Sequence, residues 1–199
     1  MRKNRIIFRK TAAVFLTSCV MLSFLPVDYV MAETVENMEE QTEETQPVGE
    51  VITISSKKDF LDFAKNSNID AWSVGKVIDL QADIDLTGTN FSQIPIFAGK
   101  FQGNGHTISG FQYKDTGYVT GLFRYLAVGG EISDLTLRGV IETQNEKECV
   151  GGICGSNAGI IKNCTFEGSV SGKSKIGGIA GINEISGTIR DCKTKGQLS

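Results

Sequence analysis

The stretch that decides the fold is VGGICGSNAGIIKNC, Val150–Cys164. It holds two adjacent glycines and two cysteines, and a further cysteine, Cys149, directly precedes it. Metal sites, phosphate-binding loops and the turns of a repeating scaffold can all have such a composition. The rest of the chain decides among these three interpretations.

A six-residue pattern that begins with isoleucine recurs along the chain. Its copies are Ile108–Tyr113, Ile132–Leu137, Ile161–Phe166 and Ile189–Thr194. A glycine-rich block precedes the last two copies. Its tetrads are Gly152-Ile153-Cys154-Gly155 and Gly178-Ile179-Ala180-Gly181, with a weaker echo at Gly121-Leu122-Phe123. Recurrence at roughly this period is typical of a stacked array, in which each unit buries its apolar face against its neighbours.

The six-residue pattern indicates strands rather than helices. Its first, fourth and sixth positions are mostly apolar, which requires a bend at the third position. That position holds Gly110, Asp134, Asn163 and Asp191. These residue types adopt left-handed backbone conformations at low cost. Two short strands per turn with glycine corners predict an all-β fold, a right-handed parallel β-helix, over residues 51–199.

Two further elements are predicted ahead of the repeats. Ser56 and Asp59 have the spacing of a capping box, and the apolar stripe behind them predicts a short capping helix that ends near residues 66–68. The stripe consists of Phe60, Leu61, Phe63 and Ala64. Strict alternation over Ile78–Leu86 predicts one strand. Its polar positions, Asp79, Asp83 and Asp85, are interpreted as a solvated strand face rather than a calcium site.

The two glycine tetrads resemble GLUG motifs, and Phe97–Ile108 resembles the segment that precedes such motifs. The resemblance covers roughly residues 52–198. GLUG repeats occur in bacterial surface proteins, including adhesin-like proteins and the non-catalytic N-terminal region of immunoglobulin A1 metallopeptidases. Arg124 stands where the first copy should carry glycine, so we expect a reshaped corner there. Those peptidases carry an H-E-x-x-H zinc motif, whereas this chain has one histidine, His106, so the resemblance carries over no protease activity.

The cysteine spacing argues against a metal site. Cys149, Cys154 and Cys164 lack the paired spacing of zinc ribbons and of plant-type iron–sulfur sites. Cys164 and Cys192 occupy the apolar fourth position of the pattern, and Cys154 matches Ala180 of the next glycine tetrad, so we expect all three to be small core residues. An exported chain permits disulfides, and Cys149 with Cys154 or Cys164 with Cys192 are the candidate pairs, but the sequence leaves the pairing of these four cysteines open.

Phosphate binding and carboxylate catalysis have weaker support. Gly168–Ser174 lacks the first glycine of a phosphate-binding loop and is interpreted as a turn. Asp134 and Asp191 form an acidic ladder on rungs either side of Asn163, which could flank a sugar bond as in an inverting glycosidase. Asp and Asn also suit corners, and we favour that interpretation. We therefore predict no catalytic, cofactor-binding or metal-binding residue, and no cofactor.

Residues 1–32 have the anatomy of a secretory signal. Five basic residues among the first ten precede an apolar run, and a small-residue cleavage site ends at Ala32. The run is too short to span a membrane, so no transmembrane anchor is predicted in this chain. The predicted location is secreted or at the bacterial cell surface. Cys19, in a lipoprotein-like box, offers acylation as the alternative.

Charge separates the remaining chain into two zones. Residues 33–50 hold seven acidic residues and no basic one, which predicts a disordered acidic spacer. From Val51 onward 15 acidic residues face 15 basic ones, and this balance argues against nucleic acid as a partner. Because the pattern stops within a repeat, we expect the natural chain to continue past Ser199 with further domains.

The predicted function is a non-enzymatic scaffold or adhesin-like module that presents one long, flat face. A glycan or a host or extracellular protein is the predicted partner. The alternative is a carbohydrate-active β-helix enzyme, or the accessory region of a surface peptidase whose catalytic domain lies elsewhere.

Overall fold

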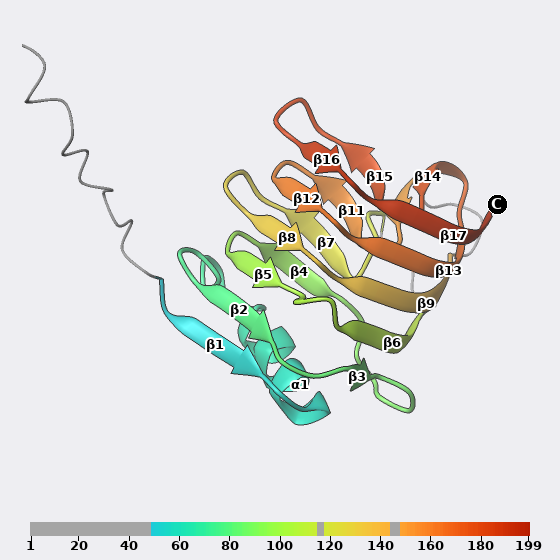
Figure 1. Cartoon of the computed structure of the whole chain (residues 1–199). Helices are drawn as coiled ribbons and strands as arrows, with labels where there is room; N and C mark the ends of the chain where they lie inside the picture. The colour runs from blue at the N-terminus through green and yellow to red at the C-terminus, as the bar shows by residue number, and fades with distance from the viewer. Residues whose placement is uncertain (1–48, 115–117, 144–147) are drawn as a thin grey trace, which may run out of the picture. The chain divides into compact units, whose positions relative to one another are not determined.

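The described part of the chain is one continuous stack of coils. The computed structural model describes residues 49–114, 118–143 and 148–199, so the predicted signal peptide and residues 33–48 of the predicted spacer lie outside it. Strands pair in parallel with the strands one turn away along the stack, and one short helix lies near the first strands (Figure 1). The predicted parallel β-helix with a short capping helix is therefore confirmed.

Four parallel sheets form the sides of the stack. The six-stranded sheet contains β1 (Val51–Ile54), β2 (Val77–Leu80), β5 (Lys100–Gln102), β8 (Glu131–Ser133), β12 (Ile160–Lys162) and β16 (Thr188–Arg190). The five-stranded sheet contains β3 (Ile84–Asp85), β6 (Thr107–Tyr113), β9 (Thr136–Glu142), β13 (Thr165–Ser171) and β17 (Lys193–Leu198). The four-stranded sheet contains β4 (Ile94–Phe97), β7 (Phe123–Leu126), β11 (Cys154–Asn157) and β15 (Ala180–Asn183). The two-stranded sheet contains β10 (Glu148–Gly151) and β14 (Ser174–Gly177).

Each full turn has three or four strands, so the prediction of two per turn was wrong. A turn runs from the four-stranded sheet to the six-stranded sheet and on to the five-stranded sheet, and the later turns add β10 or β14. The six-residue pattern contains a corner. It therefore spans the end of one strand and the start of the next, and the glycine block marks another corner before it.

Strand register confirms the repeat for the last three copies of the pattern. Ile132, Ile161 and Ile189 lie in line on β8, β12 and β16. Ile108, by contrast, pairs with Leu137 on β9, so the first copy was misaligned. The residue in register with Ile132 is Phe101, and the longer corner that follows it hides the six-residue pattern there. Four residues separate Gln102 from Thr107, whereas only two separate their register partners, Ser133 and Thr136.

The single strand predicted over Ile78–Leu86 is two strands in two different sheets. β2 ends at Leu80, β3 begins at Ile84, and the chain turns a corner between them. Apolar residues alternate straight through this corner, so a period of two cannot distinguish one strand from two. Hydrogen bonds from the next coil hold the corner in place: Asn104 Nδ2 donates to Leu80 O at 2.9 Å, and Thr107 N donates to Asp83 Oδ1 at 2.8 Å.

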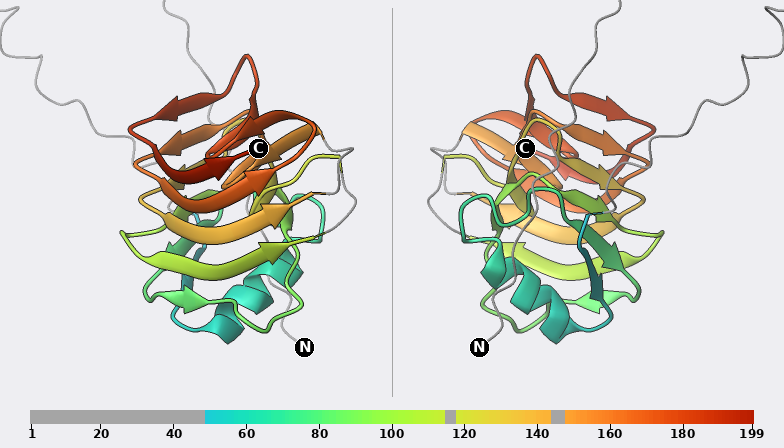
Figure 2. Two further views of the ribbon diagram at one scale, coloured as in Figure 1. Left: turned by 90° about the vertical axis from the view of Figure 1, so that its right-hand side faces the viewer. Right: turned by 90° about the vertical axis from the view of Figure 1, so that its left-hand side faces the viewer.

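Helix α1 (Lys57–Asn66) covers the N-terminal end of the stack, opposite the last coil (Figure 2). It begins as predicted, because Ser56 is its N-cap and Ser56 Oγ accepts a hydrogen bond from Asp59 N at 3.2 Å. Phe63 is buried on its inner face and contacts the rings of Phe97 and Phe101, at centroid distances of 6.0 Å and 5.8 Å. The helix thereby shields the first coils from water.

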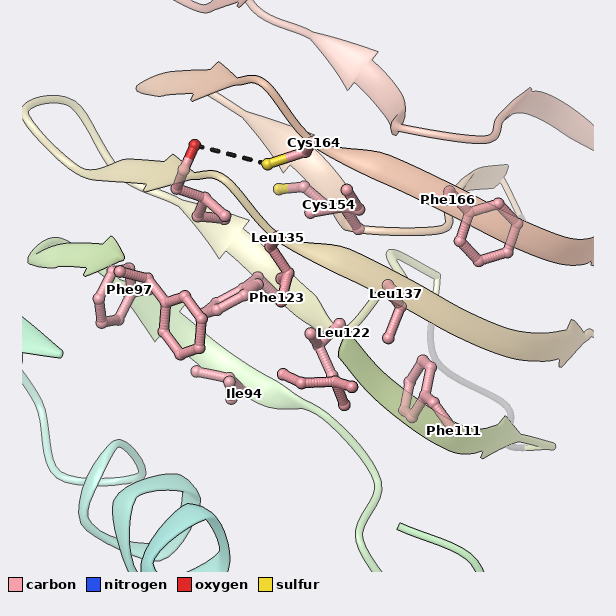
Figure 3. Close-up of a cluster of buried hydrophobic side chains, with 14 of the residues drawn as sticks. Ile94, Phe97, Phe111, Leu122, Phe123, Leu135, Leu137, Cys154, Cys164 and Phe166 are labelled. Atoms are coloured by element: carbon pink, nitrogen blue, oxygen red, sulfur yellow. Dashed lines mark hydrogen bonds between the residues drawn. The ribbon is translucent and has the colours of Figure 1, made fainter. Parts of the chain in front are cut away.

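The core changes in character along the stack (Figure 3). Phenylalanines fill the coils near the helix, where the Phe97 and Phe123 rings lie 5.3 Å apart. Farther along, smaller side chains such as Ile153 and Cys154 take several of the fully buried positions, together with the ring of Phe166. In the last coil the inward positions are partly open, since Ile189 is 36% exposed, whereas its register partner Ile161 is fully buried.

Candidate functional surfaces

The Gly152–Gly155 tetrad builds the corner between β10 and β11. A side chain at Gly152 would place its Cβ 2.1 Å from Gly178 O in the next coil and 2.4 Å from the Phe166 ring. A Cβ at Gly155 would lie 2.8 Å from Arg124 O in the previous coil. Real Cβ contacts do not reach such distances, so only glycine lets the coils approach this closely. Ile153 and Cys154 between them are fully buried.

The Gly178–Gly181 tetrad repeats this arrangement one coil later. Cys154 pairs with Ala180 in register. A Cβ at Gly181 would come within 2.4 Å of the Cys149 backbone, and one at Gly178 would meet the Thr194 side chain. Both predicted motifs are therefore stacking corners, and their residues present no chemically reactive group to solvent.

The corner around Arg124 is not reshaped, contrary to our expectation. Phe123 and Tyr125 on either side of it pair in unbroken register with Cys154 and Ser156 of the next coil. The Arg124 guanidinium lies over the Tyr125 ring, 5.2 Å from its centroid. A larger side chain is tolerated at this position because it extends from the strand over a neighbouring ring.

Asp134 and Asp191 occupy the corner between the six-stranded and five-stranded sheets, together with Asn163. All three have left-handed backbones, with φ of 55°, 55° and 53°. This confirms that the third position of the pattern is a bend. Asn163 Nδ2 donates to Asp134 Oδ1 at 3.1 Å, which links two coils. Asp191 lies next to Arg190, with 3.4 Å between the carboxylate and guanidinium atoms. The left-handed backbones agree with the corner interpretation that we favoured, and nothing here tests the catalytic alternative for this acidic ladder.

Asp79, Asp83 and Asp85, for which the sequence offered a calcium site as the alternative to a solvated strand face, each accept a hydrogen bond from a protein group. Asp79 Oδ1 accepts from Asn104 Nδ2 at 2.7 Å. Hydrogen bonds from the backbone N–H of Thr107 and from His106 hold the pKa of Asp83 below its usual range. Asp85 caps the turn at Thr87 and also has a lowered pKa, caused by hydrogen bonds from that residue. Asp79 and Asp83 thus link their corner to the next coil, whereas Asp85 holds a turn within its own coil.

The four cysteines of the described residues are free thiols. Cys154 and Cys164 are fully buried, as expected for small core residues, and burial raises the pKa of Cys154 to about 12. Cys149 lies in β10 with a left-handed backbone, φ 66°, and burial raises its pKa. Cys192, in the last coil, is half-buried. In the 49–114, 118–143 and 148–199 segments no group of three metal-ligating side chains converges.

An open groove of about 580 Å³ runs between α1 and the loop that precedes β4. Leu61 and Lys65 line it from the helix, and Phe91 and Gln93 line it from the loop. Among the described residues that line it, Lys65 is the one charged residue and none carries a carboxylate. Neither Asp134 nor Asp191 lines this groove. The acidic ladder and the groove are therefore separate features of the described structure.

The outward face of the five-stranded sheet is a broad ordered polar surface. Its strands β6, β9 and β13 have seven residues each and β17 has six. One column on this face joins three charged side chains in register. Glu167 Oε2 accepts from Arg138 Nε at 2.7 Å, and Glu167 Oε1 accepts from Lys195 Nζ at 2.9 Å. These contacts, led by the one with Lys195, lower the pKa of Glu167.

Mostly polar residues flank this charged column on both sides, with Val140 as the apolar member. A column of hydroxyl groups runs beside it, at Thr107, Thr136 and Thr165, with Lys193 next in register. On the other side run Gln112, Val140, Ser169 and Gln197. Sequence reasoning predicted a long flat face without locating it. The sequence could have located this face, because the outward residues of each column recur at the period of the repeat.

The corners and the stacked coils show that this chain is a parallel β-helix built from repeats. Residues 148–171, which span β10 to β13, match a family model described as the GLUG motif. This confirms the motif predicted at Gly152–Gly155, while the likeness to immunoglobulin A1 metallopeptidase regions remains a prediction.

A second likeness is to part of a much longer protein. An alignment of 142 residues is 38% identical to halomucin of Haloquadratum walsbyi (strain DSM 16790 / HBSQ001). It covers 66% of this chain and 2% of halomucin. No solved structure matches the chain. In the part of the chain that the structure describes, no helix is long and apolar enough to cross a membrane.

Proposed function

We propose that this chain is a non-catalytic scaffold or adhesin-like module of an extracellular or cell-surface protein. Its contact surface is the outward face of the five-stranded sheet, and its partner is a glycan or another extracellular protein. One observation carries the proposal. The distinctive residues of the chain, its glycine tetrads and its corner Asp and Asn, join coil to coil, whereas the regular columns on this face point away from the core.

The comparisons support the extracellular or surface setting. A GLUG turn lies within the chain, and two thirds of the chain resemble a small part of halomucin. Both are consistent with a repeat module that belongs to a longer surface protein. The proposed export rests on the predicted signal peptide, which places cleavage after Ala32.

The chemistry of the face suits a polar partner. Hydroxyl, amide and charged groups stand in columns on adjacent rungs, at the ~4.8 Å spacing of hydrogen-bonded strands. Such a surface offers many hydrogen bonds at fixed positions without a deep pocket. Contacts of this kind add up over a long glycan or over a flat protein surface.

A binding screen with the whole chain tests the proposal. After a partner is found, the double variant Gln112→Ala with Lys195→Ala removes two exposed side chains from the face, and Lys100→Ala removes an exposed lysine from the six-stranded sheet as a matched control. We expect the face variant to weaken binding about ten-fold or more and the control to leave it unchanged. Equal losses in the two variants would contradict the assignment of the face.

Export has its own test. The intact mass of the protein recovered from cells and medium should correspond to a chain that begins at Glu33. A start at Cys19 with added lipid would instead make the protein a lipoprotein. A mass that retains Met1 and the whole leader would contradict export through this signal.

A further inference from the structure

Cys164 and Cys192 lie one above the other at the same corner of the last two coils. Directly after this corner, Thr165 of β13 pairs in register with Lys193 of β17. Lys193 N donates to Cys164 O at 2.9 Å, which ties the two coils together beside the thiols. The two side chains also make equivalent contacts. Each thiol donates to the carbonyl two residues earlier, at 3.1 Å for Cys164 and 3.2 Å for Cys192.

This stacking satisfies the backbone requirement of a disulfide. Adjacent rungs of a sheet are spaced by about 4.8 Å, and disulfides join residues whose Cα atoms are about 4.4–6.8 Å apart. The corresponding corner of the previous coil holds Leu135, so the thiol pair is particular to the last two coils. Both thiols are free and therefore available for reaction.

The two thiols differ in their access to solvent. Cys164 is fully buried beneath the last coil, whereas Cys192 is only half-buried within it. Neighbouring inward positions of the last coil are also open, since Ile189 is 36% exposed and Leu198 is 49% exposed. Cys192 is therefore the more accessible of the two thiols in the described structure.

We propose that Cys192 and Cys164 form a thiol–disulfide exchange site, which takes a small disulfide such as oxidised glutathione as its oxidant and ends as a Cys164–Cys192 disulfide. Cys192 is the attacking thiol and Cys164 is the resolving thiol. The product joins the coil of β16 and β17 covalently to the coil of β12 and β13. This inference does not depend on the proposed function of the outward face.

The reaction balances in two steps. The Cys192 thiolate attacks one sulfur of the small disulfide, a mixed disulfide forms at Cys192, and the first small thiolate leaves. Cys164 then gives up its proton and attacks Cys192 Sγ, the mixed disulfide breaks, and the second small thiolate leaves. The two cysteines lose two protons and two electrons together. The oxidant gains the electrons and departs as two thiols.

The environment of each thiol agrees with this order of attack. A hydrogen bond with the Cys164 thiol lowers the pKa of Cys192 to about 6, against the opposing effects of partial burial and of the Asp191 carboxylate. The same contact and burial raise the pKa of Cys164. The accessible thiol is thus the one that ionises first, and thiolates are the attacking species in exchange.

The experiment uses the reduced full-length chain and oxidised glutathione under native conditions. Samples are quenched with a thiol-alkylating reagent at increasing times and analysed by intact mass and peptide mapping. We expect one intramolecular disulfide, between Cys164 and Cys192, while Cys154 remains a thiol. Cys192 should be consumed at least about ten-fold faster than Cys154. Reduction with dithiothreitol should restore all the thiols.

Three variants separate the roles. Cys164→Ala should stop the reaction at a mixed disulfide between glutathione and Cys192, and Cys192→Ala should yield neither product. Cys154→Ala is the matched control, because its register partner is already Ala180, and it should form the disulfide at the wild-type rate. A Cys192 that stays unmodified in the folded wild-type chain would overturn the proposal. So would a mixed disulfide that persists equally with and without Cys164.

Discussion

Gly152→Ala tests the stacking role of the GLUG corner most sharply. The new Cβ would lie 2.1 Å from Gly178 O and 2.4 Å from a ring carbon of Phe166. An ordinary contact lies beyond about 3.4 Å, so the next coil has to move by roughly 1 Å. No strained φ is involved at this glycine, so the expected cost comes from packing and from the hydrogen bonds that the movement weakens.

The magnitude follows from the groups at this corner. Three backbone bonds join the coils here, donated by Gly152 N, Ile153 N and Cys154 N at 3.1, 3.1 and 2.9 Å. Weakening two of them costs about 1–3 kcal/mol, since each contributes about 0.5–1.5 kcal/mol. Overpacking against the Phe166 ring adds about 1–3 kcal/mol. We therefore expect the free energy of unfolding to fall by about 2–6 kcal/mol.

Gly129→Ala is the matched control. Nothing lies within 4 Å of the Cβ that it would add, but its φ is 81°. Its cost should therefore be the conformational cost alone, about 1–2 kcal/mol. Urea unfolding followed by circular dichroism measures both variants. If Gly152→Ala costs no more than Gly129→Ala, the tight approach of the coils at the GLUG corner is not what requires glycine.

Three further perturbations have defined outcomes. Ser56→Ala removes the N-cap of α1 and should lower the free energy of unfolding by about 1 kcal/mol in the same urea assay, whereas Ser56→Asp, which keeps a capping oxygen, should largely preserve it. Asn163→Ala loses the bond to Asp134 and places alanine at φ 53°, so it should cost about 1–3 kcal/mol, and Asn163→Gly should cost less because glycine tolerates that φ. The lowered pKa of Glu167 means that its carboxylate stabilises the fold above the ordinary value of 4.5, and that this contribution is lost as pH falls below it. The melting temperature of the wild type should therefore drop more than that of Glu167→Gln on acidification, and parallel curves would show that the charged column contributes nothing.

Local chemistry was predictable from the sequence. Ser56 and the apolar stripe that follows it were enough to predict helix α1 and its first residue. The residue types of Asp134, Asn163 and Asp191 were enough to predict left-handed corners. The glycine tetrads were also found, because their recurrence is a property of the sequence. These features depend on residues that are close together in the chain.

Features set by the closure of the coil were not predictable in the same way. The corner between Gln102 and Thr107 is two residues longer than its later equivalent, so the six-residue pattern is not visible from Phe101, the residue in register with Ile132. The break between Leu80 and Ile84 left no mark on the apolar alternation. The outward columns, such as Arg138–Glu167–Lys195, appear only after the register between coils is known.

The measurement that tests the proposed function most directly is binding and turnover on the same partner. A glycan or protein selected in the screen is titrated calorimetrically with the whole chain, and the recovered partner is then analysed by mass and for new reducing ends. We predict saturable binding, an unchanged partner, and the same behaviour in Asp134→Asn and Asp191→Asn. Product that accumulates with the wild type and disappears in either variant would contradict a non-catalytic module and would make the acidic ladder a catalytic site.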